Sequence, residues 1–139
     1  MEHIYTLIKI LTVTLGSFLG YFFGGWDTIL QILVVLTIVD YITGLIASGY
    51  KGNLKSKIGY KGIAKKVVMF LLVGVAAQVD TVLGSNNAIR EATLFFFIGN
   101  ELLSVLENSA RIGIPLPNIL TNSVEILKSK SNSKREGPK

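Results

Sequence analysis

Residues 28–47 read TILQILVVLTIVDYITGLIA, a run of twenty in which Asp40 is the only charge. A helix of about 20 mostly apolar residues, rising 1.5 Å per residue, crosses the roughly 30 Å of hydrocarbon in a bilayer. Twelve of these residues are Leu, Ile or Val. Together they favour insertion by roughly 4–7 kcal/mol, against about 2.5–3.5 kcal/mol for one central Asp. The run therefore predicts a transmembrane helix.

Two more segments have the same character. Residues 4–25 carry Lys9 as their only charge, and residues 67–84 carry Asp80 as theirs. The first is longer than the core of a usual signal peptide and lacks a small-x-small cleavage site, so we expect an uncleaved helix. Asp80 is a candidate bundle residue, but a position near the outer membrane interface is favoured for it.

For a fourth segment, residues 88–108, the free energies that favour and oppose membrane insertion nearly cancel. Its ten strongly apolar residues favour insertion by roughly 3–6 kcal/mol, against the cost of Asn100, Glu101 and Glu107. This helix either spans with help from the others or lies in the interface. We predict an all-α membrane protein of one domain, residues 1–130, with transmembrane spans at these four places.

Basic residues predict the topology. Residues 48–66 hold six lysines and no acid, and residues 111–139 hold six further basic residues. Cytoplasmic loops are enriched in Lys and Arg. This loop and both termini are therefore predicted to lie on the cytoplasmic side of a bacterial cytoplasmic membrane. Lysines next to a membrane attract anionic lipids. Few aromatic residues that could stack on bases lie among them, so no nucleic-acid binding is predicted. The six are Lys51, Lys55, Lys57, Lys61, Lys65 and Lys66.

The C-terminal part is predicted to leave the membrane. Pro115 and Pro117 end any helix before them. Residues 118–130 follow with an amphipathic pattern that predicts a short helix. Residues 131–139 are polar and basic and are expected to be disordered.

Asp40 is the first candidate functional residue. On a helix it shares a face with Thr37, Tyr41, Gly44 and Ser48, so its carboxylate is expected to look into a seam of small and polar side chains. Carboxylates inside a bilayer are costly and are functional candidates by default. The alternative is a neutral, protonated Asp40 that only hydrogen-bonds the bundle together.

A polar stripe marks the fourth segment. Asn100, Glu101, Ser104, Glu107 and Asn108 fall on one helical face, with apolar residues covering the rest. Such a helix can line a water-filled lumen, turn its stripe into a bundle, or lie on the membrane surface. Packing within one copy is the structural alternative to a lumen.

Glycines mark possible contact faces. Gly16, Gly20 and Gly24 recur at a spacing of four, and Gly44 follows Asp40 by one turn. Small residues one turn apart let another backbone approach closely in lipid. We expect this face of the first helix either to self-associate or to pack within the monomer.

Catalytic chemistry has little to work with here. The chain has no cysteine and one histidine, His3, near the end of the chain. It carries no phosphate-binding glycine loop, catalytic triad or metal-ligand motif. No enzyme, cofactor or metal site is predicted.

The order of four motifs resembles the bacteriophage holin family of Gram-positive phages, which includes holin-like proteins used by clostridia in toxin release. The motifs are DYITG at 40–44, KGIAKK at 61–66, ELLSVLEN at 101–108 and GIPLP at 113–117. The likeness covers roughly residues 36–127, and the last two motifs are its most specific part.

The resemblance implies a small membrane protein that accumulates, oligomerises into lesions at a set time, depolarises the cell and releases an endolysin or a toxin. An antiholin is a further possible partner. Two alternatives come from other classes: a small ion or solute transporter that uses Asp40 and Glu101 as coupling carboxylates, and a membrane scaffold subunit. The absence of a convincing internal repeat speaks against the transporter.

Overall fold

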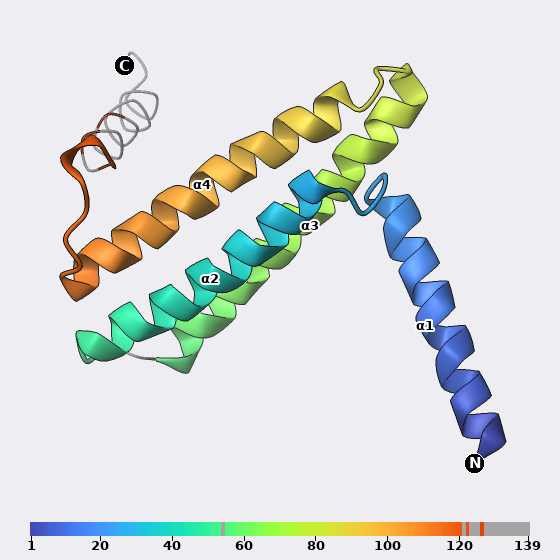
Figure 1. Cartoon of the computed structure of the whole chain (residues 1–139), viewed down its shortest axis with the longest axis horizontal. Helices are drawn as coiled ribbons and strands as arrows, with labels where there is room; N and C mark the ends of the chain where they lie inside the picture. The colour runs from blue at the N-terminus through green and yellow to red at the C-terminus, as the bar shows by residue number, and fades with distance from the viewer. Residues whose placement is uncertain (54, 121, 123–125, 127–139) are drawn as a thin grey trace.

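The computed structural model describes residues 1–53, 55–120, 122 and 126 (Figure 1). Most of the predicted amphipathic helix at 118–130, and the whole tail at 131–139, lie outside the described residues; residues 118–120 are helical. The four long helices are α1 (Glu2–Phe22), α2 (Thr28–Tyr50), α3 (Ser56–Leu83) and α4 (Ala88–Ile112).

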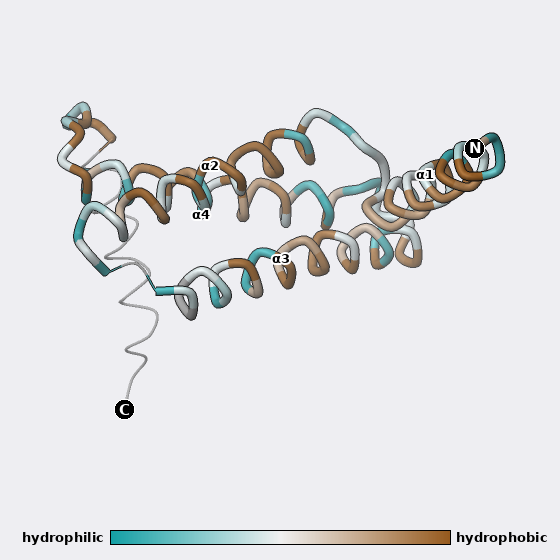
Figure 2. The backbone as a smooth tube through the Cα atoms, turned by 90° about the horizontal axis from the view of Figure 1, so that it is seen from below, coloured by the Kyte–Doolittle hydropathy of each residue, from teal (hydrophilic) through white to brown (hydrophobic). Residues whose placement is uncertain are grey.

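Helices α2, α3 and α4 run side by side as a bundle (Figures 1 and 2). An apolar core holds them together and includes three side chains with no exposed surface, Leu30, Leu33 and Leu94. Met69 and Val73 complete this core from α3. The core lies toward the end of the bundle where α2 and α4 begin, and polar side chains join the helices on either side of it.

Helix α1 projects away from the bundle and has no buried residue (Figure 1). It is attached near its C-terminal end, where the Phe22 ring lies over Gly74 of α3. A Cβ added at Gly74 would lie 2.0 Å from that ring, so only glycine admits this contact. Apolar side chains are exposed along the rest of α1, which suits a helix surrounded by lipid.

The predicted all-α membrane architecture is confirmed. Among the described residues, three helices are long and apolar enough to cross a membrane: Glu2–Phe22, Thr28–Tyr50 and Gly59–Leu83. Helix α4 does not qualify by composition, but its 25 residues extend about 37 Å, enough to accompany a spanning helix.

All four helices differ from the predicted spans at one or both ends, and two of these differences change the predicted glycine face and lysine loop. The first helix ends at Phe22, so Gly24 lies in the following turn with φ +73° and is out of register with Gly16 and Gly20. Helix α3 begins at Ser56, eleven residues before the predicted span, because its lysines are good helix formers. The expected lysine loop is therefore only a short turn after Tyr50, which we call the lysine turn (residues 51–55).

Candidate functional site

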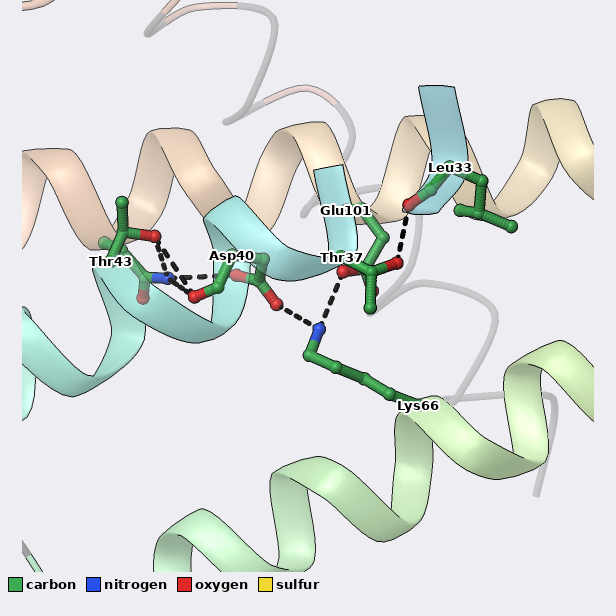
Figure 3. Close-up of polar contacts among 7 residues, drawn as sticks. Leu33, Thr37, Asp40, Thr43, Lys66 and Glu101 are labelled. Atoms are coloured by element: carbon green, nitrogen blue, oxygen red, sulfur yellow. Dashed lines mark hydrogen bonds and ion pairs between the residues drawn. The ribbon is translucent and has the colours of Figure 1, made fainter. Parts of the chain in front are cut away.

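The polar centre of the bundle is an ion cluster formed by three helices (Figure 3). The Lys66 ammonium of α3 lies 2.6 Å from Oδ2 of Asp40 on α2 and 2.7 Å from Oε2 of Glu101 on α4. The three side chains are only 11–15% exposed. One lysine therefore links two carboxylates that are far apart in the sequence.

Asn108 completes the cluster about two turns along α4 from Glu101. Its Nδ2 donates to Oδ1 of Asp40 at 2.9 Å, to the Asp40 carbonyl at 3.2 Å and to Oγ1 of Thr43 at 3.1 Å. A Cβ added at Gly44 would lie 3.5 Å from that amide nitrogen, so the small residue gives Asn108 room. Both carboxylate oxygens of Asp40 are thus occupied, one by an ammonium and one by an amide.

The charge balance of this cluster is unequal. Two carboxylates face one ammonium, so the formal charge of the trio is −1 when all three groups are ionised. Separated charges at membrane depth are costly, and pairing or water is what makes them tolerable. The cluster therefore favours the arrangement in which all three helices stay together, and it is a place where the bundle is sensitive to any change of charge.

A second polar centre lies at the end of the bundle where α2 and α4 begin, which we call the Arg90 end. Asp80 of α3 is 3% exposed. Its Oδ1 accepts from the amide of Ile89 at 3.0 Å and from the Ser85 hydroxyl, and its Oδ2 accepts from the amide of Arg90 at 2.7 Å. Asp80 thus caps the first turn of α4. The predicted position near the membrane interface did not indicate this role.

The Arg90 side chain was not among the predicted site residues, yet it is 1% exposed. Its guanidinium donates to both Asp27 carboxylate oxygens, at 2.7 and 3.0 Å, and to the carbonyls of Phe23 and Gly25. Asp27 also accepts from the amide of Leu30 at 3.1 Å and so begins α2. The available signal was an Asp directly before an apolar run, together with a single arginine in the stretch 67–110, which has no other basic residue.

This pair has an electrostatic consequence in the turn between α1 and α2. The hydrogen bonds from Arg90 are the main reason that the pKa of Asp27 is held below its ordinary value, against a smaller opposing effect of burial. The ionised pair therefore ties the α1–α2 turn to the start of α4 at neutral pH.

With this geometry established, comparison with known proteins assigns the family. The sequence profile of the bacteriophage holin family matches residues 17–129. The chain belongs to the bacteriophage holin family.

Relatives of this holin-family chain come from bacteria and a phage. An uncharacterized protein of Listeria innocua is 45% identical, covering 94% of this chain and 93% of its own. An uncharacterized protein of Clostridium perfringens is 37% identical, covering 94% and 99%. A protein of Bacillus phage phi105 named a probable holin is 36% identical, covering 77% and 79%. No solved structure matched the chain.

In this holin-family chain the stripe of α4 is divided. Glu101 and Asn108 are buried in the ion cluster, Ser104 and Glu107 are half-buried, and Asn100 is exposed. In the single copy most of the stripe therefore faces the interior of the bundle.

The lysines divide in a similar way. Lys66 was grouped with the lipid-facing lysines, but the structure places its ammonium between two carboxylates. Its aliphatic stem extends from α3 toward the neighbouring helices. The side chain of Lys57 lies outside the described part, and four others are exposed: Lys51, Lys55, Lys61 and Lys65.

The glycine face of α1 remains open. No atom of the described residues, apart from its own helix backbone and chain neighbours, lies within 4 Å of a Cβ added at Gly16 or Gly20. Gly24 instead approaches Ala77 and the Arg90 side chain, each 3.2 Å from its added Cβ. Packing within the monomer therefore applies to Gly24, while Gly16 and Gly20 stay available for a contact with another copy.

Proposed function

We propose that this chain is a lesion-forming holin that accumulates in the bacterial cytoplasmic membrane and oligomerises at a set time. The lesions would depolarise the cell and let an endolysin, or a toxin, leave the cytoplasm. The observation that carries the proposal is the inward-turned Asp40–Lys66–Glu101 cluster in a chain of the holin family. A single copy satisfies its charges internally and presents apolar surface outward, so it can accumulate without harm.

The proposed step from closed copies to a lesion uses the two halves of the molecule differently. Helix α1 is attached only near its end and exposes Gly16 and Gly20, which suits close packing between copies. Once copies are packed, the polar groups of α2, α3 and α4 can exchange their partners within the monomer for water in a shared lumen. Asp40, Glu101 and Asn108 are the residues proposed to border that lumen.

The proposed topology places both termini and the lysine turn in the cytoplasm, where exposed lysines meet anionic lipids. The proposed partners are further copies of the chain, the endolysin as the released protein, and an antiholin as a candidate regulator. We propose no catalytic role for any residue, which agrees with membership of a family of non-enzymatic membrane proteins.

The test is induced expression in a bacterial host, with membrane potential and culture density followed over time. One culture also expresses an endolysin that lacks a secretion signal, and a matched culture expresses that endolysin alone. We expect abrupt depolarisation after a delay, with lysis only when both proteins are present. Steady growth with the potential intact would reject the holin proposal in favour of a transporter or a scaffold.

A further inference from the structure

Two cavities with polar linings border the ion cluster. Their volumes are about 180 Å³ and about 420 Å³. Both are lined by the same four residues, Asp40, Gly62, Lys66 and Ser104. Since a water molecule occupies about 30 Å³ in the liquid, the cavities have room for roughly 6 and 14 waters. The cluster is thus the shared wall of two polar spaces.

Each cavity is bordered by exposed polar residues. The smaller cavity extends along the helices to Lys55 and Arg111, which are both exposed. The larger one is bordered by Lys65 and Asn100, which are also exposed. Charged and amide groups at these openings favour entry of water.

The other end of the larger cavity is closed by the apolar core. Met69 and Phe97 line the cavity and also belong to the core or pack against it. Beyond them Val73, Ala76 and Ala77 are buried on α3. From Met69 to Ala77 this apolar layer is about 12 Å thick at 1.5 Å per residue.

We propose that these cavities form a hydrated vestibule, which reaches the ion cluster from the lysine-turn end and stops at the apolar layer. The cluster contains one ammonium and two carboxylates, and water beside it lowers the cost of the unbalanced charge. The ligand of the vestibule is water, held by the carboxylates and ammonium and guanidinium groups that line it.

The charged groups around the vestibule come from all three helices. Asp40 lies on α2, Lys65 and Lys66 on α3, and Glu101 and Arg111 on α4, while Lys55 directly precedes α3. In the closed chain, polar surface therefore extends through only part of the depth of the bilayer. A lesion would need to breach about 12 Å of apolar packing rather than the full hydrocarbon thickness. The vestibule itself is a property of the single closed copy and does not depend on lesion formation.

Cysteine accessibility tests the vestibule directly, because the chain has no cysteine of its own. The test variants are Gly62→Cys on α3 and Ser104→Cys on α4. A Cβ at Gly62 meets nothing within 4 Å, and cysteine is nearly isosteric with serine. A cationic, membrane-impermeant methanethiosulfonate is added to one face of sealed vesicles, and the thiols left unreacted are counted after denaturation.

Four control positions define the readings. Asn53→Cys marks the lysine-turn face and Trp26→Cys the opposite face. Val35→Cys, at a site 59% exposed outside the bundle, marks lipid, and Val73→Cys marks the apolar layer. Thiols react as thiolates, which apolar surroundings disfavour, so a dry thiol should react at least about a hundredfold more slowly than a hydrated one.

We expect both test variants to react only from the face at which Asn53→Cys reacts, and at least about a hundredfold faster than Val35→Cys and Val73→Cys. Reaction as slow as at Val35→Cys would overturn the vestibule, and reaction from both faces would overturn the apolar seal. If one variant loses its cooperative unfolding transition, the other, on a different helix, decides. Because the faces are defined by the controls, the result stands whichever way the chain is oriented and whether or not it lyses cells.

Discussion

Replacing Lys66 with methionine should destabilise the bundle more than any other single change in the ion cluster. Lys66 makes contacts of 2.6 and 2.7 Å to two carboxylates, and its loss leaves both without their cation. Removing one partner of a buried ion pair costs about 3–5 kcal/mol in soluble proteins, whereas polar contacts in membrane bundles average about 0.6 kcal/mol. Residual exposure of 11–15% lets the abandoned carboxylates take up water or protons.

These limits place the expected loss at about 2–3 kcal/mol, or roughly 30- to 150-fold in the folding equilibrium. The assay is reversible unfolding in mixed detergent micelles, followed by helical circular dichroism. The single tryptophan, Trp26, lies in the α1–α2 turn and gives an independent fluorescence signal. Since that turn is remote from Lys66, both signals should shift together only if the whole bundle loses stability.

Two control variants separate charge from packing. Lys66→Arg keeps the cation, so it should lose much less stability than Lys66→Met. In the triple variant Asp40→Asn, Lys66→Met, Glu101→Gln no ion is left unpaired, and part of the loss should be recovered. The reasoning is refuted if Lys66→Met unfolds within about 0.5 kcal/mol of the unaltered chain, the range of ordinary surface substitutions.

Three further predictions address lysis, assembly and pH. Asp40→Asn should shift the time of lysis in an induced culture, because it removes one of the two negative charges that contact the Lys66 ammonium. Unchanged timing at equal expression would count against a role for the Asp40 charge. Gly20→Leu should abolish the ladder of crosslinked oligomers if the open glycine face of α1 is the contact between copies, and a normal ladder would exclude that contact. Acidification should loosen the α1–α2 turn: the pKa of Asp27 is lowered in the folded chain, so its stabilisation is present above its ordinary pKa and is lost as pH falls through the lowered value. Trp26 fluorescence should report this change, which should be absent in Asp27→Asn; an identical acid transition in that variant would assign it to other groups. The effect should be modest, since the Asp27 side chain is 45% exposed.

Local composition was sufficient for the parts of this protein that depend on the solvent. The run at 28–47 is apolar enough that only a bilayer-spanning helix accommodates it, and the motif order of the later segments was enough to indicate the holin family. Helical spacing also placed Asp40, Glu101 and Asn108 among the candidate residues. These inferences hold because hydrophobic length and helical period are properties of a short stretch of chain.

The partners of those residues depended on how the helices pack. Lys66 resembled its neighbouring lysines in sequence, and only the register of α3 against α2 and α4 brings its ammonium between Asp40 and Glu101. Arg90 resembled an ordinary loop residue until the α1–α2 turn was seen to surround it. The end of α1 at Phe22 was likewise seen only in the structure, where Gly24 has φ +73° and lies close to Ala77.

The sequence by itself thus determined that the chain is a helical membrane protein and that Asp40, Glu101 and Asn108 are polar groups in need of partners. Only the tertiary structure decided which groups meet, and that one ammonium is shared by two carboxylates from other helices inside a single copy. The physical reason is range: hydrophobic burial acts on each segment separately, whereas an ion pair depends on distances of a few ångströms between residues dozens of positions apart.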